Sequence, residues 1–255
     1  MQATEVQVTL IQLDNYGPWT GKLGNDREHR LQILQASLYS AIEESFADRG
    51  GLAFFNRFDE MLAISNGITE AQHQEVQHNV QRKSPVTISM GIGVAENPFQ
   101  AQLRASKLLQ GKGSAHSPKR NGVIACERTL DAARSYVQVM HFDVNRITQT
   151  HTDRASAYET SLHVMTIYSE LMRSFRKQEA LLFFVGGDNF IGVANGVSIE
   201  CVASLLAKYR SRNVKLKCGI GIAHTGRKAA ELATMNLDLI RNSNEDKSIL
   251  ATTRL

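Results

Sequence analysis

Residues 52–67 read LAFFNRFDEMLAISNG, and residues 181–196 read LLFFVGGDNFIGVANG. The two stretches are identical at six of their sixteen positions, and most of the other positions exchange one apolar residue for another. Each stretch places an aspartate, Asp59 or Asp188, between two apolar runs, which is typical of two strands joined by a tight turn. The repeat predicts the same β-hairpin in both halves of the chain.

The repeat extends outward from these hairpins. When the two hairpins are aligned without a gap, the strand-like segment 8–14 falls on segment 137–143. The later segments 90–94 and 218–222 also correspond after a slip of a single position, which a surface loop can absorb. We therefore expect two tandem copies of one structural unit.

Length and composition fit a two-domain protein. The chain has 255 residues, 42% of them hydrophobic, and this is enough for two cores of about 120 residues each. No apolar run approaches the roughly 20 residues that cross a bilayer, and the N-terminus does not resemble a signal peptide, so we expect a cytoplasmic protein without a membrane partner. Residues 113–121, rich in Gly, Ser, Pro and basic residues, resemble a linker. We accordingly expect domains 1–116 and 117–255.

Cysteine spacing and charge exclude several classes of site. Cys126, Cys201 and Cys218 are odd in number and far apart, which indicates neither a disulfide framework nor a zinc site. The net charge is +4, but the basic residues are scattered along the chain. This distribution suits an anionic small ligand and gives no indication of nucleic-acid binding.

Each half has the expected element order β-α-β-β-α-β followed by one more helix. The first long helix of the second half carries apolar residues at helical spacing, namely Leu162, Met165, Tyr168, Met172 and Phe175. The order is that of a ferredoxin-like split βαβ fold, in which the first and third strands lie at the centre of a mostly antiparallel sheet. The predicted fold class is therefore α+β, with two tandem ferredoxin-like domains related by internal duplication.

This topology brings the end of the first strand and the hairpin turn to the same edge of the sheet. We therefore expect Asp14 beside Asp59, and Asp143 beside Asp188. Two adjacent carboxylates repel each other unless a cation lies between them, and an oxygen-only ligand set suits Mg²⁺ or Mn²⁺ with phosphate oxygens as further ligands. Either aspartate alone is an ordinary turn residue. The repeated pairing is what predicts a site for a metal and a nucleotide.

The second half has the better pocket in sequence terms. Gly186 and Gly187 let a phosphate approach the backbone, whereas Arg57 and Phe58 occupy these positions in the first half. Arg57 can itself reach a phosphate. Further candidate nucleotide ligands, which offer backbone N–H groups, an amide or a hydroxyl, are Val144, Asn145, Arg146, Thr148 and Asn189.

The first half has its own unusual loop after Asp14, which includes Asn15, Tyr16 and the only tryptophan, Trp19. The loop is either a device that reads or stacks on a nucleotide base, with Asn15 and Tyr16 as ligands, or a buried aromatic wedge. The sequence leaves both interpretations open.

These motifs together resemble a known family. FDVN at residues 142–145 and VGGDNF at residues 185–190 resemble the palm-like core of class III nucleotidyl cyclases and GGDEF-type diguanylate cyclases, whose two aspartates hold the metals. With IQLDNYGPWT at residues 11–20 and AISNG at residues 63–67, almost the whole chain is similar to the GTP cyclohydrolase III family.

The resemblance implies palm-type domains and an enzyme that opens the imidazole ring of GTP at C8, retains the formyl group and releases two phosphates. The implied product is 2-amino-5-formylamino-6-ribosylaminopyrimidin-4-one 5′-phosphate, an intermediate towards riboflavin and deazaflavin. It also implies two or more Mg²⁺ ions, activation by K⁺ or another monovalent cation, and a homo-oligomer, expected to be a tetramer. The catalytic residues would be Asp143, Asp188 and Asp14, and the metal ligands Asp143, Asp188, Val144, Asp14 and Asp59.

Two other functions fit parts of the pattern. One is a nucleotidyl or diguanylate cyclase, but Asn189 stands where the GGDEF pattern has Glu. The other is a non-catalytic nucleotide sensor, but the presence of both Asp143 and Asp188 with both glycines argues against a degenerate site. The sequence does not identify the acid and base for opening the ring.

Overall fold

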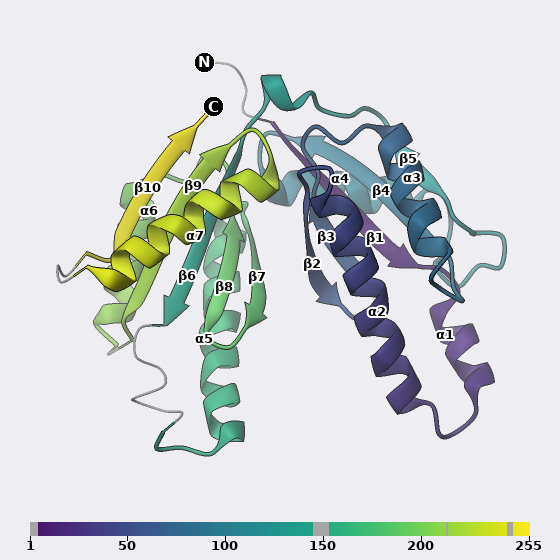
Figure 1. Ribbon diagram of the computed structural model, residues 1–255, viewed down its shortest axis with the longest axis horizontal. Coiled ribbons are helices and arrows are strands. Elements are labelled where there is room, and N and C mark those ends of the chain that lie inside the picture. The colour runs from purple at the N-terminus through teal and green to yellow at the C-terminus, as the bar shows by residue number, and fades with distance from the viewer. Residues whose placement is uncertain (1–4, 145–152, 213, 244–246) are drawn as a thin grey trace. The chain divides into compact units, whose positions relative to one another are not determined.

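The computed structural model describes residues 5–144, 153–212, 214–243 and 247–255 (Figure 1). The chain forms two compact units, which we call unit 1 (Met1–Ser135 with Thr225–Arg227) and unit 2 (Tyr136–His224 with Lys228–Leu255). Unit 1 extends beyond the expected boundary after residue 116, because the short strand β5 (Ile124–Cys126) pairs with the first sheet. Among the described helices, none has both the length and the apolar character needed to span a membrane.

Unit 1 contains a five-stranded sheet with the order β2-β3-β1-β4-β5. Its first four strands are β1 (Val6–Leu13), β2 (Leu52–Arg57), β3 (Glu60–Ile64) and β4 (Ile88–Ala95). Strand β1 pairs antiparallel with both β3 and β4, and this confirms the expected central position of the first and third strands. Strand β5, which the sequence did not predict, runs parallel to β4 at the edge.

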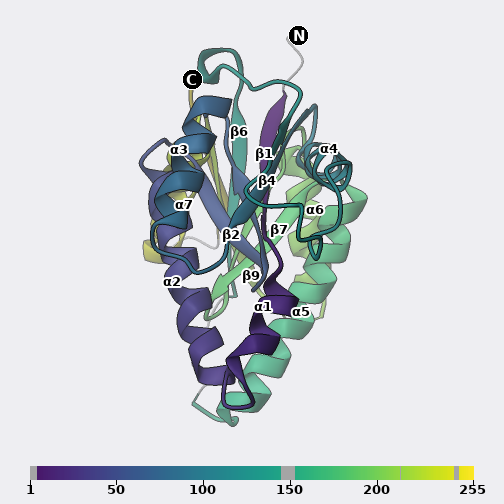
Figure 2. The same cartoon turned by 90° about the vertical axis from the view of Figure 1, so that its right-hand side faces the viewer.

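Helices cover both faces of this sheet, as Figure 2 shows. Helices α2 (Glu28–Ala47) and α3 (Glu70–Gln81) pack on one face around a core that includes Phe46, and α4 (Pro98–Gln110) packs on the other. Thr69 and Gln72 form a capping box at the start of α3. The three short helical segments are α1 (Tyr16–Thr20), η1 (Gly21–Leu23) and η2 (Ala132–Arg134).

Unit 2 has the same strand order, β7-β8-β6-β9-β10. The strands are β6 (Val137–Val144), β7 (Leu181–Gly186), β8 (Asn189–Val193), β9 (Leu216–Ala223) and β10 (Ile249–Arg254). The helices are α5 (Ala157–Lys177), α6 (Ile199–Arg210) and α7 (Gly226–Asn242).

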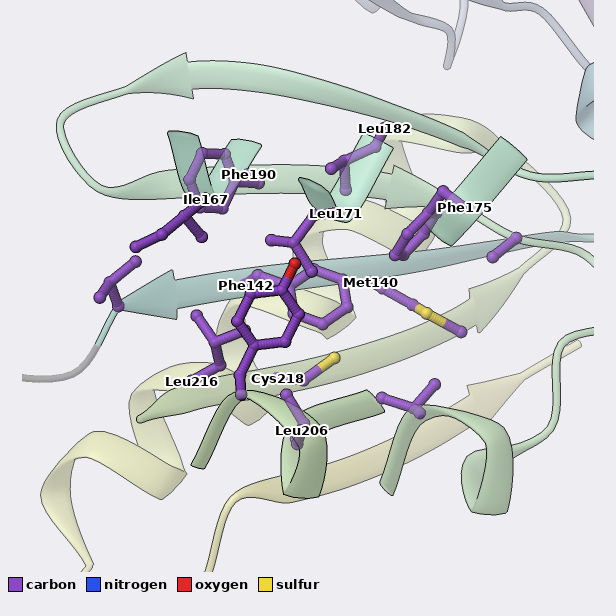
Figure 3. Packing of buried hydrophobic residues seen from close by; sticks show 14 of the residues in the cluster. Met140, Phe142, Ile167, Leu171, Phe175, Leu182, Phe190, Leu206, Leu216 and Cys218 are labelled. Atoms are coloured by element: carbon purple, nitrogen blue, oxygen red, sulfur yellow. The ribbon is translucent and has the colours of Figure 1, made fainter. Parts of the chain in front are cut away.

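One face of the second sheet packs against α5 and α6 (Figure 3). Phe142 of β6, Phe190 of β8 and Leu171 of α5 meet there, each of them fully buried. The buried residues of α5 are Val164, Ile167, Leu171 and Phe175. Of the apolar residues picked out by periodicity, Phe175 is buried and Tyr168 packs against the core, whereas Leu162, Met165 and Met172 are 62%, 39% and 44% exposed. Helical spacing alone did not separate the two apolar stripes of this helix.

Helix α7 lies directly on the opposite face of the second sheet. A Cβ atom on Gly219 of β9 would be 2.0 Å from the carbonyl oxygen of Ala233, and one on Gly221 would be 2.1 Å from that of Ala229. The two glycines therefore let the helix backbone contact the strand, because any side chain would push it away. This close packing fixes the height of α7 above β6, the neighbouring strand.

The two first strands correspond with a register that differs from the sequence prediction. Gln12 of β1 pairs with Glu60, and Asp143 of β6 pairs with Asn189. Because Glu60 and Asn189 hold equivalent places in the two hairpins, each directly after the turn aspartate, Gln12 occupies the position of Asp143. The predicted equivalence of Asp14 and Asp143 is wrong by two positions, a shift that preserves which side chains face the core.

Candidate metal and nucleotide site

Asp143 and Asp188 lie together at one end of the second sheet. Asp143 is on β6, beside Asn189 of β8, and the Val144 backbone N–H donates a hydrogen bond of 3.3 Å to the Asp188 carbonyl oxygen. The hairpin turn is thus held against the end of the central strand. The expected proximity of the two aspartates is confirmed, and their binding of a metal stays a prediction.

The hairpin turn needs glycine because of its backbone conformation. Gly186 and Gly187 have φ values of 113° and 60°, a region that other residues rarely adopt. A Cβ atom on Gly186 would meet nothing within 4 Å, so crowding does not impose the glycine there. The space in front of the turn is open to a ligand. Arg57 and Phe58, the residues at these positions in unit 1, lack this positive φ.

Arg241 of α7 brings a positive charge to the two aspartates. Its Nη2 lies 2.5 Å from Asp143 Oδ1 and 3.0 Å from Asn189 Oδ1, and its Nη1 lies 3.3 Å from Asp238 Oδ1. The Asn189 amide in turn donates to Asp188 Oδ1 at 3.0 Å. The sequence analysis missed Arg241 because it belongs to no motif and is 98 residues from Asp143.

The electrostatics of the site follow from these neighbours. Burial raises the pKa of Asp188, the negative charge of Asp143 raises this pKa further, and the positive charge of Arg241 opposes both effects. Burial alone would lower the pKa of Arg241, but its hydrogen bond to Asp143 and the charges of Asp143 and Asp238 raise it. Among the described residues, the site is therefore a pair of interacting carboxylates with the Arg241 guanidinium beside them.

His141 lies on the same face of β6 as Asp143. Its Nδ1 is 3.0 Å from the Thr234 hydroxyl of α7. Its Nε2 is buried and has no partner at hydrogen-bond geometry among the described residues. Burial, followed by the charge of Arg241, lowers the pKa of His141, so that its ring is neutral at pH 7. Sequence spacing gave no reason to select this histidine.

Asp14 of unit 1 has a different environment from that predicted. Its carboxylate accepts hydrogen bonds from the hydroxyls of Thr87 (2.9 Å) and Ser89 (2.8 Å), from Nε of Arg120 (3.0 Å) and from the Gly122 N–H (2.9 Å). The side chains of Asp14 and Arg120 are only 1% and 2% exposed. These are the contacts of a structural carboxylate, because its oxygens are already occupied by donors. They favour a structural role, and the role of Asp14 as a catalytic metal ligand stays a prediction.

The rest of the expected first-half site consists of ion-paired side chains. Arg57 lies 3.5 Å from Asp59 and 3.0 Å from Glu60, and Gln12 donates to Glu60 at 3.1 Å. Gln12 stands where unit 2 has Asp143, so unit 1 lacks the second carboxylate of the pair. The roles of Asp59 as a metal ligand and of Arg57 as a phosphate ligand stay predictions.

The loop after Asp14 is occupied by contacts within unit 1. Asn15, which has a left-handed backbone with φ 51°, donates to the Ser117 carbonyl at 3.1 Å. The Tyr16 hydroxyl accepts a hydrogen bond of 2.8 Å from Gln35, and Trp19 packs against the hydrophobic core. These contacts favour the interpretation as an aromatic wedge, and binding of a base by Asn15 and Tyr16 stays a prediction.

Three candidate nucleotide ligands, Asn145, Arg146 and Thr148, lie outside the described residues. Among the residues that the structure does describe, no group of three or more His, Cys, Asp or Glu side chains has the geometry of a metal site. The donor set at the hairpin is therefore two carboxylates and nearby backbone carbonyl groups. Such a set fits Mg²⁺, which typically binds one or two carboxylates and takes its other ligands from water and phosphate.

Comparison with known proteins gives matches over nearly the whole chain. The family described as GTP cyclohydrolase III matches residues 8–254. The GTP cyclohydrolase III of Methanothermobacter thermautotrophicus is 45% identical over 237 residues, which cover 92% of this chain and 94% of the relative. That of Methanocaldococcus jannaschii is 42% identical over 247 residues, covering 96% and 91%.

Solved structures give more distant matches. The active GGEEF domain of a diguanylate cyclase from Vibrio cholerae is 15% identical with a TM-score of 0.37, covering 48% of this chain and 84% of that domain. A bacterial light-regulated adenylyl cyclase is 11% identical with a TM-score of 0.39, covering 98% of this chain and 85% of its own.

Proposed function

Because the chain belongs to the GTP cyclohydrolase III family, we propose that it catalyses the Mg²⁺-dependent hydrolysis of GTP with opening of the imidazole ring at C8. The formyl group is retained, two phosphates are released, and the product is 2-amino-5-formylamino-6-ribosylaminopyrimidin-4-one 5′-phosphate. The relatives named GTP cyclohydrolase III support GTP as the substrate. The observation that carries the proposal is the pairing of Asp143 with Asp188 beside an open glycine turn.

In this proposal Asp143, Asp188 and the Val144 carbonyl hold Mg²⁺ at the end of β6. A bound divalent cation supplies positive charge to the phosphate oxygens and lowers the pKa of water, which assists cleavage of the phosphoanhydride bonds. The protein itself positions the phosphate groups beside the two carboxylates. The turn at Gly186 and Gly187 leaves room for a phosphate beside the carboxylates, and the closely packed α7 fixes one wall of the site.

We assign the nucleotide contacts mainly to unit 2. The backbone N–H groups of Gly186 and Gly187 and the amide of Asn189 can donate to phosphate oxygens. The segment with Asn145, Arg146 and Thr148 follows Asp143 directly and is proposed to bind the triphosphate. The ring of His141 is neutral, so it adds no positive charge that would compete with a metal ion for the two carboxylates.

The remaining parts of the proposal concern activation, cellular setting and origin. We propose that the protein binds two or more Mg²⁺ ions and is activated by K⁺ or another monovalent cation. We also propose that it acts in the cytoplasm, in riboflavin or deazaflavin synthesis, without a nucleic-acid or membrane partner. The matching strand order of the two units, and the equivalent hydrogen bonds from the N–H groups of Gln7 to Asn66 (2.9 Å) and of Gln138 to Asn195 (3.1 Å), support an origin by internal duplication.

We further propose a homo-oligomer, with a tetramer as the expected state. Supporting it, α5 exposes one apolar stripe of Tyr158, Leu162, Met165 and Met172, which are 83%, 62%, 39% and 44% exposed. Leu162→Glu should lower the mass measured by light scattering. Ile33→Glu on α2, at a side chain with 65% exposure, should not. Equal effects of both variants, or none from Leu162→Glu, would remove α5 from the contact.

One assay separates this function from its alternatives. The protein is incubated with GTP, Mg²⁺ and K⁺ while inorganic phosphate and the ultraviolet spectrum of guanine are followed together. Release of phosphate with loss of the purine chromophore is the expected result. Release of pyrophosphate with an intact purine would instead indicate a cyclase, and binding of GTP without any reaction would indicate a sensor.

A further inference from the structure

Unit 2 supplies a cation of its own to the proposed metal site. The guanidinium of Arg241 donates hydrogen bonds to Asp143 (2.5 Å) and to Asn189 (3.0 Å), and its positive charge strengthens the bond to the Asp143 carboxylate. The Asp143 side chain is only 13% exposed, so water screens this ion pair weakly. Arg241 therefore already neutralises one of the two carboxylates that are proposed to hold Mg²⁺.

A divalent cation and the Arg241 guanidinium compete for the carboxylate of Asp143. A cation held between Asp143 and Asp188 would compete with this guanidinium for the negative charge of Asp143, and two positive groups a few ångströms apart in a partly buried site repel each other. We propose that Arg241 is the counter-ion of the metal-free site and that it must leave Asp143 when a divalent cation binds. This inference rests on the metal site of the proposed function and adds a competitor to it.

The structure also offers Arg241 a second position. Asp238 lies one helical turn earlier on α7, and its Oδ1 is 3.3 Å from Nη1 of Arg241. Its side chain is 55% exposed, against 13% for Asp143. When Arg241 leaves Asp143, Asp238 retains the guanidinium at the outer rim of the site. From there the planar fork of the guanidinium is suited to bind a phosphate of the nucleotide.

The role proposed for Arg241 is supported by a comparison with the residues of unit 1 that occupy the corresponding positions. Ala101 and Ala105 of α4 contact Gly93 and Gly91 as Ala229 and Ala233 of α7 contact Gly221 and Gly219, so these contacts align the two helices position by position. Helix α4 ends at Gln110, whereas the position matching Arg241 would be 113, so unit 1 has no helical residue at the place of Arg241. Unit 1, with Gln12 in place of Asp143, lacks both the paired carboxylate and the helix arginine. The two features occur together only in unit 2 within the described residues.

The test measures binding of Mn²⁺ to the nucleotide-free protein, with free Mn²⁺ determined by electron paramagnetic resonance at pH 8 and constant ionic strength. Arg241→Met should bind Mn²⁺ about tenfold more tightly than the wild type, or about 1.4 kcal/mol, because no guanidinium has to be displaced. Arg241→Lys should stay close to the wild type. Arg212→Met is the matched control, since it removes the same charge from an ion pair between the turn after α6 and Glu170 of α5, and it should leave the affinity unchanged.

A double-mutant cycle tests the second position of Arg241. Asp238→Asn should weaken Mn²⁺ binding in the wild type, because the displaced guanidinium loses its partner, and should have much less effect in the Arg241→Met background. Equal effects of Asp238→Asn in both backgrounds would show that Asp238 does not act through Arg241, and would overturn this part of the proposal. Circular dichroism of each variant checks that the fold is retained.

The outcomes separate this inference from the proposed function. If Asp188→Asn abolishes Mn²⁺ binding but Arg241→Met leaves it unchanged or weaker, the metal site stands and the competition is refuted. If the wild type and Asp188→Asn bind Mn²⁺ equally, or neither binds it, the proposed metal site is refuted, and the inference about Arg241 is refuted with it.

Discussion

At the scale of single residues, the two units use their aspartates in different ways. Asp143 and Asp188 face each other at the end of β6, where Arg241 is their cation. Asp14 is enclosed by hydrogen-bond donors and pairs with the buried Arg120. The first pair is the one proposed to bind a metal, whereas Asp14 holds the chain segment around Arg120 and Gly122 against β1.

Asp188→Asn should abolish GTP turnover, a loss of at least about a hundredfold, because the amide removes one of two anionic oxygen ligands. The fold should be retained, since the side chain is half-exposed in a turn and the change is isosteric. Turnover is measured by phosphate release. Asp48→Asn, at an exposed aspartate after α2, is the matched control and should keep full activity. Full activity of Asp188→Asn would remove this residue from the site.

Asp14→Ala should destabilise unit 1 by about 3–5 kcal/mol, because it leaves the buried charge of Arg120 without its carboxylate partner and with only the Gly113 carbonyl as an acceptor. The fluorescence of Trp19, the only tryptophan, reports unfolding of unit 1 in urea. If the unfolding midpoint stayed unchanged while Mn²⁺ binding was lost, Asp14 would be a metal ligand after all, and its assignment as a structural carboxylate would be wrong.

At the scale of elements, the contact between α7 and β9 positions Arg241. The two glycines of β9 allow the helix backbone to touch the strand, and the guanidinium then reaches the end of the neighbouring β6. A change at these glycines therefore acts on the site through the height of the helix, without touching any residue of the site.

Gly219→Ala should destabilise the protein by about 1–3 kcal/mol or more, because the new Cβ would lie 2.0 Å from the Ala233 carbonyl oxygen. Thermal unfolding followed by circular dichroism measures the effect. Gly21→Ala, where a Cβ meets nothing within 4 Å and φ is −58°, should change stability by less than about 0.5 kcal/mol. An equal effect of the two substitutions would contradict the close helix packing.

A buried polar chain crosses the core face of unit 1. Nδ1 of His73 must donate to the Thr69 carbonyl (2.8 Å), so Nε2 accepts from the Thr9 hydroxyl (2.7 Å), which in turn lies 2.8 Å from the Ser65 hydroxyl. Burial lowers the pKa of His73 to about 4. At the corresponding positions unit 2 has Met140, Ala194 and Val202, which are apolar.

This histidine makes the stability of unit 1 depend on pH. Between pH of about 6.5 and 4 the unfolded chain binds the proton and the folded chain does not, so stability rises with pH across this window and is lost on acidification. The expected loss from pH 6.5 to 4 is about 3 kcal/mol, since each pKa unit corresponds to about 1.4 kcal/mol. Urea unfolding followed by Trp19 fluorescence measures it.

The control for the pH prediction replaces Thr9, Ser65 and His73 by their unit 2 counterparts, as Thr9→Met, Ser65→Ala and His73→Val together. Between pH 6.5 and 4 this variant should lose less stability than the wild type, and the difference should be the roughly 3 kcal/mol attributed to His73. The same pH dependence in both proteins would show that His73 is not the titrating group.

At the scale of the whole molecule, the repeated hairpin predicted the sheet order and the meeting of Asp143 with Asp188. It did not predict the register of the first strands, because a shift of two positions preserves the alternation of core and surface side chains. The available signal was the VQV triplet, which occurs at residues 6–8 and again at residues 137–139 and marks the true counterparts in the two strands.

The sequence contained no pattern that predicted β5, the burial of Arg120, the contact of Arg241 with the site or the buried face of α5. Strand β5 has only three residues, which are too few to show a periodic pattern. The composition of residues 113–121 is that of a linker, and it gives no indication that Arg120 is buried. Arg241 reaches the site only through the packing of α7, a contact between residues far apart in the chain. Apolar stripes on two sides of α5 made its buried face ambiguous.

In the proposed site, the carboxylates of Asp143 and Asp188 together bind a divalent cation that carries the nucleotide. The most direct measurement is anomalous X-ray scattering from crystals soaked with Mn²⁺ and a non-hydrolysable GTP analogue. We expect a manganese peak between the two carboxylates, with phosphate oxygens as further ligands and with Arg241 moved away from Asp143. Nucleotide bound elsewhere, with no manganese between these two side chains, would contradict it.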